Sequence, residues 1–94
     1  MTTNQRSLQD LVSVGPAFLR DFELLGIHSV AQLARRNPEK LYEQLCTAKG
    51  QTQDLCCLDV FRAAVAQAQN PSLPAEQRNW WYWSRQRKAR DARS

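Results

Sequence analysis

The chain has 94 residues, of which 43% are hydrophobic and 23% charged, and this composition fits one small domain with a single modest core. It lacks an apolar run long enough to span a membrane, an apolar signal-peptide region and paired cysteines, so we expect a soluble, cytoplasmic protein with reduced thiols and no membrane contact. The net charge of +4 lies in residues 85–94, because residues 1–84 hold eight basic and eight acidic side chains, and a neutral body argues against an extensive DNA-binding face.

The first predicted helix begins at Ser7, because Ser7 and Asp10 have the spacing of a capping box. Its inner face is expected to hold Leu8, Leu11 and Val12. Gly15 ends this helix, and Pro16 opens the next one, since a proline fits the first helical position, where no N–H is needed. The two helices, joined by a turn at Val14, Gly15 and Pro16, are expected to form a hairpin.

A glycine separates the second and third predicted helices. The second helix is predicted by apolar residues at helical spacing, which are Phe18, Leu19, Phe22 and Leu25. Gly26 fits the left-handed position that closes a helix, and Ile27 is placed to fold back onto it. Ser29 and Gln32 repeat the capping-box spacing and predict a short third helix. The apolar residues of this short helix are Val30 and Leu33.

Two longer helices follow. Asn37 and Pro38 are a cap followed by a proline at the first helical position, and they start a helix that Gly50 ends. Its inner face is expected to hold Leu41, Tyr42, Leu45 and Cys46. Asp54 is expected to cap the longest helix. In that helix apolar residues recur at three- and four-residue steps, at Leu58, Phe61, Val65 and Ala68.

The stretch "NPSLP" breaks the longest helix, and a last helix is predicted to begin near Pro74. This last helix carries Trp80, Trp81 and Trp83. No segment alternates strictly between apolar and polar residues as a strand does. We therefore expect an all-α domain of five or six short helices over residues 1–84, followed by a basic, flexible tail over residues 85–94.

The order of helix, Val-Gly-Pro turn, helix and Leu-Gly-Ile is the pattern of a helix-hairpin-helix module. "LGIHSVAQLA" continues this pattern as in the C-terminal domain of the RNA polymerase alpha subunit. Over residues 8–83 the chain resembles more closely the small bacterial helix-hairpin-helix proteins of a pathogenicity locus, which are often labelled mitomycin resistance proteins. The stretches that carry this resemblance, in order, are "VGPAFLRDFELLGIHSVAQLA", "NPEKLYEQLC", "DLCCLDVFRAAV" and "WWYW".

The resemblance implies a helix-hairpin-helix, SAM-domain-like core and an association with nucleic acid. It also implies a link to DNA damage or mitomycin resistance, and it implies no particular reaction. The expected function is therefore that of a non-enzymatic accessory domain that binds the DNA backbone weakly and without sequence specificity.

The hairpin turn is the candidate phosphate-binding site. A glycine turn that leads into a helix N-terminus presents unsatisfied N–H groups and the positive end of the helix dipole, and such contacts hold a phosphate backbone without sequence specificity. Gly15 and Ala17 would offer these N–H groups, and Arg20, one turn later, would offer a charge. The basic tail would add long-range attraction through Arg85, Arg87, Lys88 and Arg90.

The turn also departs from the usual DNA-binding hairpin. Ser13 stands where such hairpins have a first glycine, and Ala17 stands where they have a lysine or another polar residue. Asp21 and Glu23 add negative charge within two turns. Ser13 stays in the candidate set, and the alternative interpretation is that the glycine and proline only make the corner between two packed helices.

The cysteines and the single histidine do not form a metal site. Adjacent Cys56 and Cys57 diverge by about 100° on a helix and cannot easily direct both sulfurs at one ion. Cys46 and Cys57 fit as small buried hydrophobes, whereas Cys56, in the first turn of its helix, is the candidate reactive thiol. His28 is expected on the surface. The residues interpreted as caps or surface charges are Asp10, Asp21, Asp54 and Asp59. We therefore expect no metal, cofactor, small-molecule substrate or enzymatic activity.

The stretch "NWWYW" holds more aromatic surface than one helix face can bury in so small a domain. Two of its tryptophans are expected to pack the last helix onto the core. The exposed remainder, for which Trp81 and Trp83 are the candidates, would stack on bases or contact a partner protein. A protein-interaction module of the same fold is therefore the alternative to nucleic-acid binding.

Overall fold

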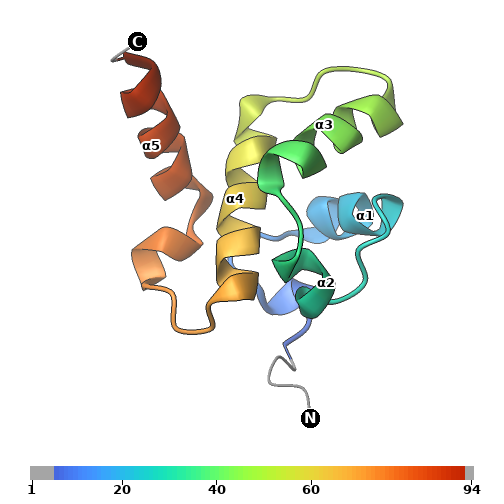
Figure 1. Ribbon diagram of the computed structural model, residues 1–94, viewed down its shortest axis with the longest axis horizontal. Coiled ribbons are helices and arrows are strands. Elements are labelled where there is room, and N and C mark those ends of the chain that lie inside the picture. The colour runs from blue at the N-terminus through green and yellow to red at the C-terminus, as the bar shows by residue number, and fades with distance from the viewer. Residues whose placement is uncertain (1–5, 93–94) are drawn as a thin grey trace.

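The computed structural model describes residues 6–92, and every regular element in that range is helical, which confirms the predicted all-α class. The elements are η1 (Leu8–Asp10), α1 (Pro16–Leu24), α2 (Val30–Ala34), α3 (Pro38–Lys49), α4 (Leu55–Gln69), η2 (Ala75–Arg78) and α5 (Trp80–Ala92), where η marks a 3₁₀ helix. Figure 1 shows α4 in the centre of the molecule, with α1, α2 and α3 on one side and η2 and α5 on the other. The central helix therefore connects two parts that differ in how they pack.

The hydrophobic core lies between α4 and the helices that precede it. Phe22 of α1 and Phe61 of α4 are both fully buried, with ring centroids 5.7 Å apart. Phe18 meets Phe61 edge-on at 5.9 Å. The remaining buried members of this cluster are Leu11, Ile27, Val30, Leu33, Leu41, Leu45, Ala64, Val65 and Ala68. The core residues predicted from helical spacing in α3 and α4 are thus largely confirmed.

The helix boundaries follow the predicted proline and glycine signals. Pro16 opens α1 and Pro38 opens α3, each at the first helical turn. Gly26 and Gly50 have φ angles of +78° and +69°, the left-handed conformation in which glycine costs least. The N–H of Ile27 donates to the carbonyl of Phe22 at 2.8 Å, so the chain folds back over the end of α1 as predicted.

The N-terminal segment is shorter than predicted. Instead of a full helix from Ser7, it forms only η1, although the Ser7 N–H does donate to the Asp10 carboxylate at 2.8 Å. The backbone is extended at Leu11, and the Val12 side chain, predicted to be internal, is 40% exposed. Gly15 does not end a helix but is the N-cap residue of α1.

Two predicted caps differ in detail from the structure. Asp54 stands at the N-cap of α4, but its side chain makes no capping hydrogen bond. The Ser29 hydroxyl accepts from the Gln32 N–H as predicted, but the Gln32 side chain accepts from the N–H of His28, one residue earlier than in a capping box. Both helices nevertheless begin where the sequence predicts.

The C-terminal segment differs most from the prediction. Pro74 precedes the short η2 helix, and a separate helix, α5, begins only at Trp80. Residues 85–92, expected as a flexible tail, continue α5 as regular helix, while residues 93–94 lie outside the described range. The expected boundary between residues 84 and 85 therefore corresponds to no change of secondary structure. A buried contact of Arg87, described below, is the physical reason.

Candidate functional site

The hairpin turn, which in the structure comprises residues 12–16, is joined to the start of α5 through Ser13. Ser13 has a φ of +74°, a backbone conformation that favours glycine. Its hydroxyl oxygen accepts from the Trp80 N–H at 3.1 Å and lies 3.5 Å from the Arg78 carbonyl. Ser13 therefore caps α5 from a distant part of the chain, a contact for which the sequence carries no local signal.

A buried glutamine of α4 fixes the same turn. The Gln67 side chain accepts from the Val12 N–H at 2.9 Å and donates to the Val12 carbonyl at 2.9 Å. The same amide nitrogen lies 3.3 Å from the Arg78 carbonyl. Because Gln67 is only 3% exposed, its amide holds the hairpin turn and the end of η2 in one place. This contact explains why the chain is extended after η1 instead of continuing as a helix.

The start of α1 is open to the surface. Gly15 has an extended backbone, and a Cβ built there would meet no atom within 4 Å, so neither its φ nor its packing requires glycine. Pro16, Ala17 and Arg20 are exposed. Arg20 makes no ion pair or side-chain hydrogen bond with any of the described residues. The predicted N–H groups and the predicted charge therefore lie on an accessible surface.

The negative charge next to Arg20 is compensated within the fold. Asp21, interpreted from the sequence as a surface charge, is 8% exposed, and its carboxylate lies 3.1 Å from the Lys49 ammonium of α3. That prediction was wrong, because Asp21 is buried and its carboxylate pairs with Lys49, the last residue of α3. Glu23 remains exposed.

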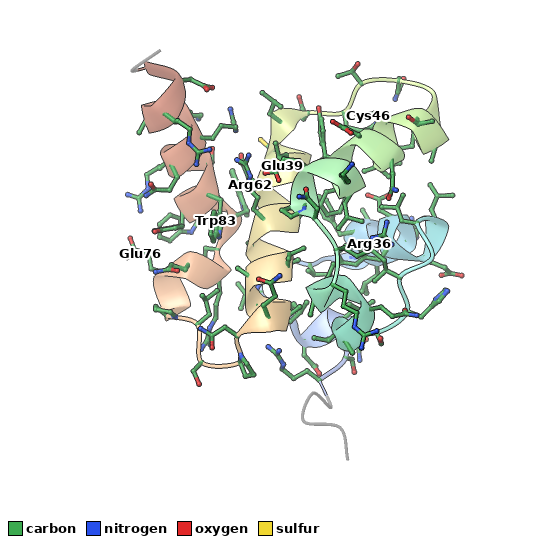
Figure 2. The ribbon with its side chains drawn as sticks, viewed as in Figure 1. Arg36, Glu39, Cys46, Arg62, Glu76 and Trp83 are labelled. Carbon is green, nitrogen blue, oxygen red and sulfur yellow. The ribbon has the colours of Figure 1, made fainter. Side chains whose placement is uncertain are left out.

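A second aspartate predicted on the surface is the most deeply buried acid in the described range. Asp59 of α4 is 0% exposed and accepts two-pronged hydrogen bonds from Arg87, at 3.2 Å from Nε to Oδ1 and 3.0 Å from Nη2 to Oδ2. The bond to Asp59 raises the pKa of Arg87 above its ordinary value. Arg62 lies 3.9 Å from the same carboxylate and 2.9 Å from Glu39 (Figure 2). Arg87, expected to contact phosphate, therefore attaches α5 to α4.

The other basic residues of α5 lie nearer to solvent. Arg85 is exposed, with its guanidinium 3.2 Å from Glu76 and 4.6 Å from the ring centroid of Trp81. Lys88 is exposed, and Arg90 is exposed beside a surface cavity. Of the four basic residues predicted to bind polyanions, three are thus exposed on α5.

The three tryptophans have two different environments. Trp80 and Trp81 are 39% and 40% exposed, whereas Trp83 is half-buried. The Trp83 indole N–H donates to the Gln77 carbonyl at 2.8 Å, and its ring forms one wall of a cavity of about 310 Å³ between α3, α4 and α5 (Figure 2). Trp83, a predicted partner contact, thus holds α5 against η2. Trp80, which was not in the candidate set, is as exposed as Trp81.

The thiols are distributed largely as predicted. Cys56 is exposed, and Cys46 and Cys57 are half-buried rather than fully internal. The Cys46 sulfur accepts from the Gln53 N–H at 3.4 Å, and burial raises the pKa of the Cys57 thiol.

No group of three or more His, Cys, Asp or Glu side chains within residues 6–92 is arranged to hold a metal ion. His28 is exposed. In the same range, each helix is too short or too polar to cross a membrane.

Similarity to known proteins identifies the family to which the chain belongs. Residues 2–89 match the family model of Cdd1, described as a pathogenicity locus. The chain belongs to the Cdd1 family. It is also 45% identical over 89 residues to the mitomycin resistance protein McrB of Streptomyces lavendulae, and the alignment covers 94% of this chain and 81% of that protein. No solved structure matches the chain.

Membership in the Cdd1 family confirms the relationship predicted from the four motif stretches. The family description and the relative's name mention no reaction. The helix-hairpin-helix core and the binding of nucleic acid stay predictions. The start of α1 and the basic side chains of α5 could be predicted from the sequence, whereas the contacts of Gln67 and Asp59 and the link from Ser13 to Trp80 could not.

Proposed function

We propose that this Cdd1-family protein is a non-enzymatic accessory protein that contributes to mitomycin resistance by associating with DNA. In this proposal it binds the phosphate backbone, weakly and without sequence specificity, through a helix-hairpin-helix. The identity of 45% with a protein named mitomycin resistance protein supports the link to resistance. The proposal requires no cofactor, metal or small-molecule substrate.

The open N-terminus of α1 is the observation that carries the DNA part of the proposal. The N–H groups in the first turn of a helix lack intrahelical partners, and the helix dipole places a partial positive charge there. The space above Gly15 is empty to at least 4 Å, so a phosphate can approach the backbone closely. Arg20 follows one turn later as an exposed charge. Together these groups suit one or two phosphate contacts.

The exposed basic residues of α5 would supply the longer-range attraction. Arg85, Lys88 and Arg90 are exposed, whereas Arg87 is held by the buried Asp59 and is not assigned to phosphate. Arg85 also has a partner in Glu76, but a salt bridge between exposed groups is weak enough to be exchanged for a phosphate. The proposed binding should therefore depend strongly on ionic strength.

Gly15→Val tests close approach at the hairpin. Because Gly15 has a φ of −95° and open space around it, a valine side chain fits without strain, and the melting temperature should stay close to that of the parent. Affinity for a fluorescently labelled duplex, measured by anisotropy, should fall. Unchanged affinity in Gly15→Val would remove the hairpin turn from the interface.

Arg20→Ala tests the neighbouring charge. Each phosphate contact contributes about 0.9 to the slope of log affinity against log salt on duplex DNA, so this variant should flatten the slope by about that amount. Arg35→Ala is the matched control, because Arg35 is also an exposed arginine but lies at the end of α2. Equal slopes for Arg20→Ala and the parent would contradict the assigned contact.

The link to resistance is tested in cells. Deletion of the gene should increase sensitivity to mitomycin, and the parent chain should restore resistance. Gly15→Val should restore it less well than Arg35→Ala, since only the first variant blocks the proposed DNA contact. Full complementation by Gly15→Val would separate resistance from the hairpin.

A second candidate function is that of a protein-interaction module. The observation that favours it is the exposure of Trp80 and Trp81 on the first turn of α5, since exposed tryptophans often form the centre of protein interfaces. A complex with a partner protein that survives high salt and is lost in Trp81→Ala would support this function over DNA binding.

A further inference from the structure

We propose that the hairpin turn and the first turn of α5 form one binding surface for single-stranded DNA, in which Trp80 and Trp81 stack on unpaired bases. This inference rests on the proposed association with DNA and specifies the form of DNA that is bound.

The hairpin turn and the start of α5 are rigidly joined. The Ser13 hydroxyl binds the Trp80 N–H at 3.1 Å, and the buried Gln67 amide binds the backbone of Val12 on one side and the Arg78 carbonyl on the other. Figure 1 shows the segment before α1 passing behind α4 toward the start of α5. Two residues after Ser13, Gly15 caps α1. The open backbone at the start of α1 and the first turn of α5 therefore lie close together, and hydrogen bonds hold them in place.

The tryptophans leave aromatic surface uncovered at this junction. Trp80 and Trp81 are 39% and 40% exposed, and Val12, next to Ser13 in the sequence, is 40% exposed. Trp83, by contrast, uses its indole N–H and its ring within the fold. Adjacent residues on a helix diverge by about 100°, so Trp80 and Trp81 offer two separate stacking surfaces. Such surfaces suit bases that are splayed apart.

The charge around these rings favours a polyanion over an apolar protein surface. Arg85 lies 4.6 Å from the Trp81 ring centroid and so covers one part of that ring with a cation. A base that stacks on the uncovered part of Trp81 has its phosphate close to this guanidinium. Apart from Arg87, which binds the buried Asp59, α5 carries three basic residues and one acidic residue, and Arg85 also pairs with the exposed Glu76 of η2. Aromatic rings interleaved with cations are the usual composition of surfaces that bind single strands.

Duplex DNA cannot use the same rings. Its bases are already stacked on each other, so an aromatic side chain reaches a base face only where the strand is unpaired. The hairpin backbone contact is available to both forms, since it involves phosphate alone. We therefore expect a preference for single strands that depends on the tryptophans. The phosphate contact at the hairpin turn should be the same for single strands and duplex and should not depend on the tryptophans.

Two fluorescence measurements on the full chain test the inference. Anisotropy compares a labelled oligothymidine with a labelled duplex of the same length, and tryptophan emission follows titration of the unlabelled oligothymidine. We expect tighter binding of the single strand, with quenched emission. Trp80→Ala and Trp81→Ala should each weaken single-strand binding at least about fivefold and leave duplex binding within about twofold. Trp81→Phe, which keeps an aromatic ring, should recover most of the loss.

Leu24→Ala is the matched control, because Leu24 is also a large exposed apolar residue (56%) but lies at the far end of α1. Its melting temperature and both affinities should stay close to those of the parent. If Trp80→Ala and Trp81→Ala bind oligothymidine as the parent does, the stacking surface is overturned while the duplex contact of Gly15 and Arg20 stands. If neither form of DNA binds the parent chain, both proposals fail, and a salt-resistant protein complex lost in Trp81→Ala would identify the rings as a protein contact.

Discussion

The two sides of α4 are packed in different ways. Toward α1, α2 and α3, the central helix buries an apolar cluster whose members lie between Leu11 and Ala68. Toward η2 and α5, it presents Asp59 and Gln67, which bind charged and polar partners. One side of the same helix is thus held mainly by nonspecific apolar contact and the other largely by directed hydrogen bonds.

This difference in packing shows which contacts hold α5 in place. Its described side chains include one buried residue, Ser84, and its tryptophans are exposed or half-buried, so apolar area alone is a weak constraint on its place. Arg87 on Asp59 and Trp80 on Ser13 are specific contacts at two points along the helix. Buried polar contacts that are fully satisfied can specify a single arrangement, and here they fix the helix that carries the candidate binding surface.

The largest expected effect is that of Asp59→Ala. This change removes the buried carboxylate that binds Arg87. The Arg87 side chain, which is only 16% exposed, then keeps its charge without this partner. Removing one partner of a buried ion pair costs about 3–5 kcal/mol, which is a large part of the free energy of unfolding of a small domain. Urea unfolding measures the loss. A loss below about 1 kcal/mol would mean that α5 is held in some other way.

Two further variants sharpen this test. Lys88→Ala changes an exposed basic residue one position beyond Arg87 and should alter stability by no more than about 0.5 kcal/mol. The double variant Asp59→Leu with Arg87→Met replaces the ion pair with apolar side chains and should recover most of the loss. Failure of the double variant to recover stability would show that packing, not charge, is limiting at this site.

The next effect in size is that of Gln67→Leu. The leucine fills similar space but leaves the Val12 N–H and carbonyl, whose bonds to Gln67 are partly buried, without their partner. A fully buried group left unsatisfied costs about 1–3 kcal/mol, so each of these groups should cost toward the lower end of that range. We expect a total loss of about 2 kcal/mol or more, measured by urea unfolding. Gln69→Leu is the control, since the exposed Gln69 makes a single bond to the Ala34 carbonyl. Equal losses in both variants would contradict the role of Gln67.

The same contrast, between apolar packing and directed hydrogen bonds, explains which parts of the fold can be predicted from the sequence. Apolar spacing and the signals at Pro16, Pro38 and Gly50 predict the helices around the core, because helix periodicity and end signals act locally. Asp59 and Gln67 have no such local signal. Their partners lie 28 and 55 residues away, and a charged or amide side chain in a helix is indistinguishable in sequence from a solvent-exposed one.

The candidate site divides in the same way. The adjacent glycine and proline predict the open backbone at Gly15. The place of Arg20 one turn later predicts a charge beside it. The position of Trp80 beside the hairpin turn could not be predicted. It depends on a hydrogen bond from the Trp80 N–H to the Ser13 hydroxyl, 67 residues away in the sequence. The expected flexible tail was inferred from charge alone, which takes no account of a buried acid that binds Arg87.

A smaller effect is expected for the exposed rings. Trp80→Ala should cost about 1 kcal/mol, because a side chain that is 39% exposed in the folded state loses less apolar burial than a core tryptophan. Trp83→Ala should cost more, about 2–3 kcal/mol, since that ring is half-buried and its N–H binds the Gln77 carbonyl. Thermal unfolding of the two variants compares them. The reverse order would mean that Trp80, not Trp83, packs α5 against the body.

The smallest expected effects concern the three thiols, which lie on α3 and in the first turn of α4. The exposed Cys56 should react with iodoacetamide faster than the half-buried Cys46 and Cys57, and mass spectrometry of timed samples measures the three rates. Equal rates would contradict the difference in exposure between Cys56 and the other two.

The Cys57 thiol also predicts a dependence of stability on pH. Burial raises its pKa in the folded state above the ordinary value of about 8.5, so the folded chain keeps this proton to higher pH than the unfolded chain does. The resulting contribution to stability is complete below pH 8 or so and is lost as the pH rises through the unfolded and then the folded pKa. Between about pH 7.5 and 10, the melting temperature of the parent should therefore fall more than that of Cys57→Ala, which lacks the titrating group. Cys56→Ala, on the exposed side of the same turn, should fall in parallel with the parent, and an equal fall in all three proteins would assign the alkaline loss to other groups.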